Sequence, residues 1–260
     1  MAKPVQKTNP KSSTKTKWWV VFGILGLVAI AVVGVIGYFV YNAANPLPAD
    51  NAVFNGITVR TDVKFADRGS YYAITPNSDI NAGLILYPGA FADPRAYVDR
   101  YAELAQQGVA VFVVRSPFNF ALLDTNRGDR IMRENNMIDK WYVAGHSLGG
   151  VAACEFAKSN EEKLSGLILL GSFCNGNAAD LTIPVLSVSA SRDGLSTPDK
   201  ITASKQQLPA DTQFIVIDGA NHTQFGMFTR TQGGDNSASI SDQQAQQQII
   251  TAISQFVSER

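Results

Sequence analysis

The sequence has few cysteines and histidines and no excess of charge of either sign. Its 260 residues include two cysteines, two histidines, 22 basic and 22 acidic residues. The cysteines and histidines lack metal-ligand spacing, so we expect no metal and no other cofactor. The charges divide unevenly, because residues 1–17 contain five lysines and no acid, which leaves the rest of the chain at −5. That acidic balance gives no electrostatic reason to expect nucleic-acid binding.

Residues 18–41 form a run of 24 residues without a charge. About 20 apolar helical residues cross the hydrocarbon core of a bilayer, so the run predicts one transmembrane helix that acts as a signal anchor. Aromatic residues lie at both of its ends, where such rings prefer the membrane interface: Trp18, Trp19, Tyr38, Phe39 and Tyr41. The preceding lysines favour a cytoplasmic N-terminus, which places the rest of this single-pass chain outside the membrane.

Two other readings of this segment exist. A cleaved signal peptide has a shorter apolar region, and residues 42–44 match a cleavage site poorly. A buried core helix is seldom apolar on every face. We therefore expect a basic cytoplasmic tail (1–17), an anchor (18–41), a proline-containing linker (42–51) and one domain (52–260). Cleavage of the anchor in the cell stays open.

The domain alternates strand-like and helix-like segments, which predicts an α/β fold with a mostly parallel sheet. The expected strands are 53–60, 71–75, 83–87, 109–114, 140–144, 167–170, 185–189 and 214–217, and the first two are expected to pair as a hairpin. The expected helices are 97–106, 121–135, 148–158, 198–207 and 242–257. Residues 231–241 are polar and are expected to be a solvated loop.

Gly145-His146-Ser147-Leu148-Gly149 has the G-x-S-x-G pattern of a nucleophile elbow. Such a serine sits on a sharp turn between a strand and a helix, and the glycines leave room for the backbone to pass. The expected strand before the motif and the expected helix after it supply this context. Ser147 is therefore the candidate nucleophile.

A serine hydroxyl needs a base to remove its proton. His146 lies inside the elbow, which leaves His222, after the last expected strand, as the candidate base. A carboxylate must orient that base, and Asp193 lies at the end of an expected strand. Asp218 is the rival acid, because it lies four residues before His222. The order Ser147, Asp193, His222 is that of α/β hydrolases.

An oxyanion hole needs two backbone N–H donors. The residue after the nucleophile, Leu148, is expected to supply one of them. The second is expected from the turn after the strand at 83–87, where Ala90 is the first choice and Phe91 the alternative.

Residues 82–257 resemble the α/β-hydrolase superfamily, and in particular its small, lidless branch near the dienelactone-hydrolase-like proteins. The matching segments are 87–120, AGHSLGG (144–150), SRDGLSTPDKI (191–201) and GANHTQFG (219–226). The resemblance implies a twisted, mostly parallel sheet with helices on both faces, and it carries the triad roles to Ser147, Asp193 and His222. Dienelactone hydrolases have a cysteine nucleophile, and relatives often have His-Gly where this chain has Pro88-Gly89. About 14 residues separate the strands between which a cap is usually inserted, so we expect no large cap.

These features predict a serine hydrolase that cleaves a small-molecule ester through an acyl-enzyme at the outer face of a membrane. Transfer of the acyl group to a cell-envelope acceptor is an alternative, and a non-catalytic binding module is another. Four phenylalanines are expected at strand ends, where they line an acyl or alcohol pocket or pack into the core: Phe91, Phe118, Phe120 and Phe173. Cys154 and Cys174 are expected either to form a disulfide or to be buried thiols.

Overall fold

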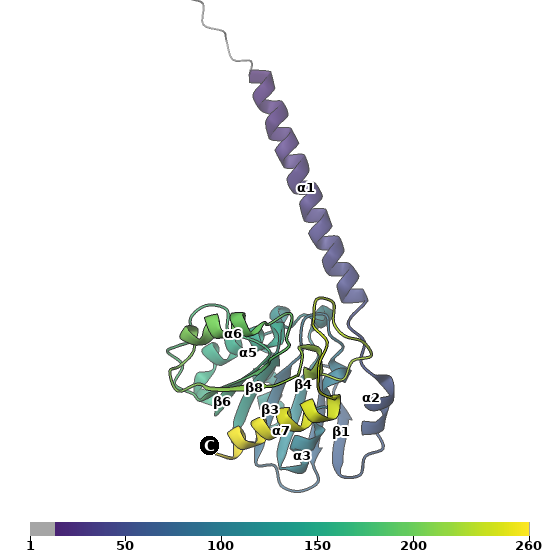
Figure 1. Cartoon of the computed structure of the whole chain (residues 1–260), viewed down its shortest axis with the longest axis vertical. Coiled ribbons are helices and arrows are strands. Elements are labelled where there is room, and N and C mark those ends of the chain that lie inside the picture. Colours follow the sequence, from purple (N-terminus) through teal and green to yellow (C-terminus); the bar gives the residue numbers. More distant parts are fainter. Residues whose placement is uncertain (1–13, 260) are drawn as a thin grey trace, which may run out of the picture. The chain divides into compact units, whose positions relative to one another are not determined.

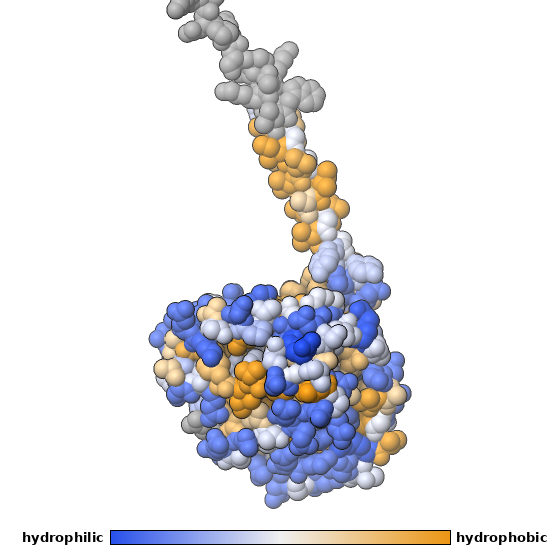
Figure 2. All heavy atoms as spheres, in the orientation of Figure 1, coloured by the Kyte–Doolittle hydropathy of each residue, from blue (hydrophilic) through white to orange (hydrophobic). Residues whose placement is uncertain are grey.

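The computed structural model describes residues 14–259, which divide into two units. The first unit is one long helix, α1 (Thr14–Ala44), and the second begins at Asn45. Within α1, Val21–Ala44 is long and apolar enough to cross a membrane, a property that signal sequences share. Figure 2 shows hydrophobic side chains along this helix. Residues 1–13 of the predicted basic tail lie outside the described residues.

Among the described residues, eight strands form a sheet in the order β1-β2-β4-β3-β5-β6-β7-β8 (Figure 1). β2 pairs antiparallel with β1 and β4, and all the other neighbours are parallel. The strands are β1 (Val63–Asp67), β2 (Tyr71–Pro76), β3 (Ala82–Tyr87), β4 (Val109–Val114), β5 (Trp141–His146), β6 (Gly166–Leu170), β7 (Val185–Ala190) and β8 (Gln213–Ile217).

Helices cover both faces of this sheet. The α-helices are α2 (Asn51–Ile57), α3 (Ala102–Gln106), α4 (Arg127–Glu134), α5 (Leu148–Ser159), α6 (Pro198–Ser204) and α7 (Asp242–Ser258). The short 3-10 helices are η1 (Pro94–Tyr97), η2 (Pro117–Asn119), η3 (Ala121–Leu123), η4 (Glu161–Lys163), η5 (Lys205–Gln207) and η6 (Thr223–Phe225). α3 and α7 contact each other over one face, as Figure 1 shows.

The five strands β3–β7 are buried along their whole length. Successive residues of β3 point to opposite faces, so Leu84 and Leu86 pack in the core under α3 and α7, whereas Ile85 and Tyr87 pack under α4 and α5. A parallel sheet covered on both faces needs apolar side chains at every position. This requirement explains why these strands were predicted within one or two residues.

The predicted strand at 53–60 is wrong, because α2 occupies most of this segment. The Asp50 carboxylate caps the helix by accepting the backbone N–H groups of Ala52 (2.9 Å) and Val53 (3.2 Å). Phe54 then packs its ring on Phe65 of β1. The hairpin partner of β2 is therefore β1, which follows the helix. The predicted helix at 97–106 is shorter than expected, since only its second half is α-helical, as α3.

The connection between β6 and β7 covers residues 171–184 and holds no cap domain, as predicted. A disulfide joins Cys174 in this connection to Cys154 in α5. The cross-link decides between the two states that the sequence left open for these cysteines.

Within the predicted linker (42–51), the segment 47–50 forms hydrogen bonds with the domain. The backbone N–H of Leu47 donates to the Phe91 carbonyl (2.7 Å), and Asp50 donates to the Met227 carbonyl (3.0 Å). Thr229 donates its N–H to the Pro48 carbonyl (3.1 Å), and Leu47 is buried. We call residues 47–50 the strap. It joins the turn after β3 to the segment that follows His222.

Candidate active site

Ser147 lies on a strained turn between β5 and α5. Its φ of 54° and ψ of −127° are conformations that residues with a side chain rarely adopt. The turn is tight enough that a Cβ on Gly145 would lie 2.1 Å from the Gly149 carbonyl oxygen, and a Cβ on Gly149 would lie 2.1 Å from the Tyr87 carbonyl oxygen. Ser172 Oγ donates to the Ser147 carbonyl (2.6 Å) and fixes the turn from the β6 side. The two glycines of the motif are thus required by space.

His222 and Asp193 lie against each other at the ends of the neighbouring strands β8 and β7. Nδ1 of His222 is 2.7 Å from Oδ2 of Asp193, and both side chains are fully buried. The other carboxylate oxygen accepts the N–H groups of Leu195 (2.8 Å) and Ser196 (2.7 Å). The carboxylate is therefore oriented by its own loop, and its Oδ2 lies against Nδ1 of His222, which leaves Nε2 as the ring nitrogen without contact to Asp193.

The rival acid Asp218 does not contact His222 through any hydrogen bond in the described part of the chain. Its carboxylate accepts the hydroxyl of Ser191 (2.8 Å), and the same hydroxyl accepts the N–H of Gly219 (2.8 Å). Asp218 thus pins the turn after β8, while Asp193 faces the base.

No hydrogen bond joins Ser147 to His222 in the described part of the chain. Nε2 of His222 is buried and has no hydrogen-bond partner among the residues that the structure describes. The ring of His146, next to Ser147 in the chain, lies 4.4 Å from the His222 ring, centroid to centroid. Hydrogen bonds of catalytic groups are often long without substrate and tighten when it binds.

The turn after β3 presents one uncommitted amide near Ser147. Gly89 donates its N–H to Tyr97 Oη (3.0 Å), Phe91 to the Asn119 carbonyl (2.7 Å), and Ala92 to the Gly89 carbonyl (3.3 Å). Within the described residues, the Ala90 N–H has no such acceptor. Leu148 is the first residue of α5, and N–H groups in the first turn of a helix have no partner within that helix. Ala90 and Leu148 therefore offer two donors, and Phe91 does not.

The geometry agrees with the sequence comparisons. The sequence model of the alpha/beta hydrolase family matches residues 83–248, which is more than half of the chain. The chain belongs to the alpha/beta hydrolase family. A comparison with curated protein sequences gave no match.

Three solved structures share the fold of this chain. TT1662 from Thermus thermophilus has 13% identity and a TM-score of 0.55, with 76% of this chain and 99% of that chain covered. Est1E from Butyrivibrio proteoclasticus has 16% identity and a TM-score of 0.51, with 76% and 98% covered. A monoacylglycerol lipase from Paleococcus ferrophilus has 13% identity and a TM-score of 0.53, with 73% and 98% covered. At such identities the likeness shows the fold.

In this hydrolase, His146 connects the turn after β3 to the base. Its Nδ1 lies 2.8 Å from Tyr97 Oη, which already accepts the Gly89 N–H. Burial, and then the neighbouring His222, hold the pKa of His146 well below its ordinary value. Burial raises the pKa of Tyr97, so its hydroxyl stays protonated. This hydroxyl donates a hydrogen bond to Nδ1 of the neutral His146. Sequence reasoning set His146 aside; the structure gives it a packing role beside His222.

Asp235 is a second carboxylate at the site, and it was not among the predicted site residues. Its Oδ1 accepts the N–H of Gly194 (3.0 Å), next to Asp193, and that of His222 (3.3 Å). Its Oδ2 accepts the N–H (2.8 Å) and the hydroxyl (2.6 Å) of Thr223. The polar loop 231–241 was expected to be solvated surface, but this carboxylate joins the loop of the acid to the loop of the base.

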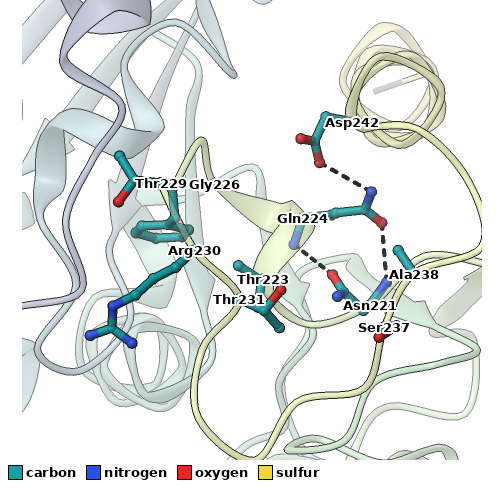
Figure 3. A pocket seen from close by; sticks show the side chains of 11 residues that line it. Asn221, Thr223, Gln224, Gly226, Thr229, Arg230, Thr231, Ser237, Ala238 and Asp242 are labelled. Atoms are coloured by element: carbon teal, nitrogen blue, oxygen red, sulfur yellow. Dashed lines mark hydrogen bonds between the residues drawn. The ribbon is translucent and has the colours of Figure 1, made fainter.

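A polar pocket of about 280 Å³ is lined in part by Asn221 and Thr223, the residues on either side of His222 (Figure 3). In its wall, Gln224 donates its N–H to the Asn221 side chain (3.1 Å) and its side-chain amide to Asp242 of α7 (3.1 Å). These bonds fasten the loop to α7. The pocket contains no predicted catalytic residue.

The candidate pocket phenylalanines lie beside the turn after β3 or on the β6–β7 connection. The rings of Phe91 and Phe120 are 5.3 Å apart, centroid to centroid. Phe118 is exposed, and Phe173 is half-buried. None of these four side chains belongs to the buried core of the described residues.

Proposed function

We propose that this hydrolase cleaves carboxylic esters through an acyl-enzyme, with Ser147 as nucleophile, His222 as base and Asp193 as the group that orients His222. The observation that carries the proposal is the buried His222–Asp193 pair beside the strained Ser147 turn. The monoacylglycerol lipase that shares the fold supports an ester as the substrate class.

In the first half of the reaction, Ser147 Oγ attacks the ester carbonyl carbon while its proton passes to Nε2 of His222. The Asp193 carboxylate stabilises the imidazolium that forms. The negatively charged carbonyl oxygen accepts hydrogen bonds from the N–H groups of Leu148 and Ala90. Collapse of the tetrahedral intermediate breaks the bond to the alcohol oxygen, which takes the proton from His222 and leaves.

In the second half, water attacks the acyl group on Ser147, and His222 takes the proton of that water. The second tetrahedral intermediate uses the same two N–H donors. Its collapse returns a proton to Ser147 Oγ and releases the carboxylic acid. One base serves both halves, because His222 passes its proton to the leaving alcohol before water attacks.

We also propose that α1 anchors the enzyme in a membrane, with an N-terminus in the cytoplasm and the catalytic domain outside. The apolar segment Val21–Ala44 supports an anchor, and the lysine-rich start of the chain supports this direction. The Cys154–Cys174 disulfide supports a compartment that permits such bonds.

Labelling with a fluorophosphonate probe tests the catalytic proposal. We expect the wild-type chain and the control Ser258→Ala to be labelled, since Ser258 is an exposed residue of α7. Ser147→Ala is expected to resist labelling and to lose ester hydrolysis. Equal labelling or equal hydrolysis by Ser147→Ala would refute the mechanism. No labelling of the wild type would favour the binding-module alternative.

A further inference from the structure

Among the exposed large apolar side chains of the catalytic domain, three lie close together in the sequence. Phe118 is 63% exposed, Leu123 is 54% exposed and Leu122 is 38% exposed. They lie within six consecutive residues, on η2 and η3. We call these three residues the apolar rim. Exposure of such a group to water is unfavourable in free energy, and burial against a lipid or protein surface would remove this cost.

The apolar rim lies beside the candidate active site. The carbonyl of Asn119, next to Phe118, accepts the N–H of Phe91 in the turn that carries Ala90. η3, which carries Leu122 and Leu123, packs on α5, the helix that begins directly after Ser147. The rim is therefore built on the two elements that supply the proposed oxyanion donors.

The backbone under the rim is strained. Phe118 and Asn119 have φ values of 57° and 53°, a conformation that is uncommon for residues other than glycine and rare for an aromatic residue. Strain of this kind persists only where surrounding contacts hold it, and it gathers at functional sites. Here the Phe91–Asn119 hydrogen bond holds the segment while Phe118 stays exposed.

The strap ties this part of the domain to the end of the proposed anchor. Leu47 donates its N–H to the Phe91 carbonyl and accepts the N–H of Asp93 (3.0 Å). Only three peptide units separate Leu47 from Ala44, the last residue of α1, and they span at most about 11 Å. A chain held in a bilayer by α1 therefore keeps the turn after β3 near the lipid surface.

We propose that the apolar rim inserts into the bilayer that holds α1, so that the enzyme takes long-chain esters dissolved in the membrane. This inference deepens the proposed function and rests on it for the chemistry. The bilayer is the occupant because the strap holds the rim's neighbour, Phe91, close to the anchor. The charges beside the rim are paired, Arg127 with Asp124 and Arg115 with Asp67, so insertion relies on apolar contact and not on anionic lipid.

The test compares two esters with the full chain reconstituted in phosphatidylcholine vesicles. One is water-soluble p-nitrophenyl acetate, and the other is a fluorogenic long-chain ester dissolved in the bilayer. In Phe118→Ser/Leu123→Ser, we expect the ratio of membrane-ester rate to soluble-ester rate to fall at least about ten-fold. The control Met137→Ser removes a side chain that is 90% exposed. Met137 precedes the amino-terminal end of β5, whereas Ser147 follows the carboxyl end of that strand, so the control is expected to keep the wild-type ratio. An unchanged ratio in the double variant, including an equal fall of both rates, would overturn the proposal.

A second measurement does not need catalysis. Leu123→Cys carrying an environment-sensitive fluorophore is expected to be quenched by spin-labelled phosphatidylcholine, whereas the same label at Met137→Cys is not. Equal quenching at both positions, or none at Leu123→Cys, would refute insertion. If neither ester is hydrolysed by the wild type but Leu123→Cys is quenched, the proposed chemistry fails and the membrane contact stands.

Discussion

Nδ1 of His222 lies 2.7 Å from Oδ2 of Asp193, although the two residues are 29 positions apart in the sequence. They follow β8 and β7, which are neighbouring parallel strands. The carboxyl ends of parallel strands lie at one edge of the sheet, which brings the two loops together.

Asp193→Asn is expected to lower kcat/KM for a soluble ester by about 10³- to 10⁴-fold, because the amide no longer holds the required tautomer of His222. Asp218→Asn is the matched control. It removes a carboxylate that bonds Ser191 and is expected to retain activity within about ten-fold, the effect of one hydrogen bond. Steady-state kinetics with both variants checks this. A larger loss in Asp218→Asn than in Asp193→Asn would reverse the assignment.

Asp235→Ala is expected to lower kcat by about 10- to 100-fold with little change in KM. The substitution removes the acceptor of the Gly194 and Thr223 N–H groups, and lost hydrogen bonds to a charged group correspond to about 1.5–3 kcal/mol. The base and acid loops then lose their common contact. Separate measurement of kcat and KM on a soluble ester tests the effect.

Asp211→Ala serves as the control for Asp235→Ala, because Asp211 is exposed in the turn before β8. We expect its kinetics and its thermal midpoint to match the wild type. A wild-type kcat in Asp235→Ala would show that the loop 231–241 does not position the base.

His146 is expected to make folding stability pH-dependent. Its pKa is lowered in the folded state, so the unfolded chain binds a proton that the folded chain does not. The stability that is present above the ordinary pKa of about 6.5 is therefore lost as the pH falls below that value, by up to about 1.4 kcal/mol per pH unit. Unfolding free energies at pH 7, 6 and 5 measure the slope. His146→Gln is expected to have a shallower slope than the wild type, and an equal slope would contradict the argument.

Reduction of the Cys154–Cys174 disulfide is expected to lower the free energy of unfolding by about 3 kcal/mol. The two cysteines are 20 residues apart, and opening a loop of this length restores entropy to the unfolded chain. The free energy of unfolding, measured by denaturant titration with and without dithiothreitol, tests this. Cys154→Ala/Cys174→Ala is expected to show no effect of the reductant, so a shift in that variant would mean that dithiothreitol acts elsewhere.

The sequence alone determined the central strands and the nucleophile turn. β4 was predicted residue for residue, because a strand buried on both faces is a continuous apolar run. The turn at Ser147 was readable because its glycines are required by local space, and local space leaves a pattern at fixed spacing.

Only the tertiary structure decided what depends on residues far apart in the chain. Asp193, and not Asp218, contacts His222 because the loops after β7 and β8 come together in the folded chain. A local sequence pattern does not show such a contact. Asp235 bonds backbone N–H groups, which every sequence offers, so its contacts leave no signature. The segment at 53–60 was misread for a related reason: its β-branched and aromatic residues suit a strand, but the cap at Asp50 and the packing of Phe54 on β1 make it a helix.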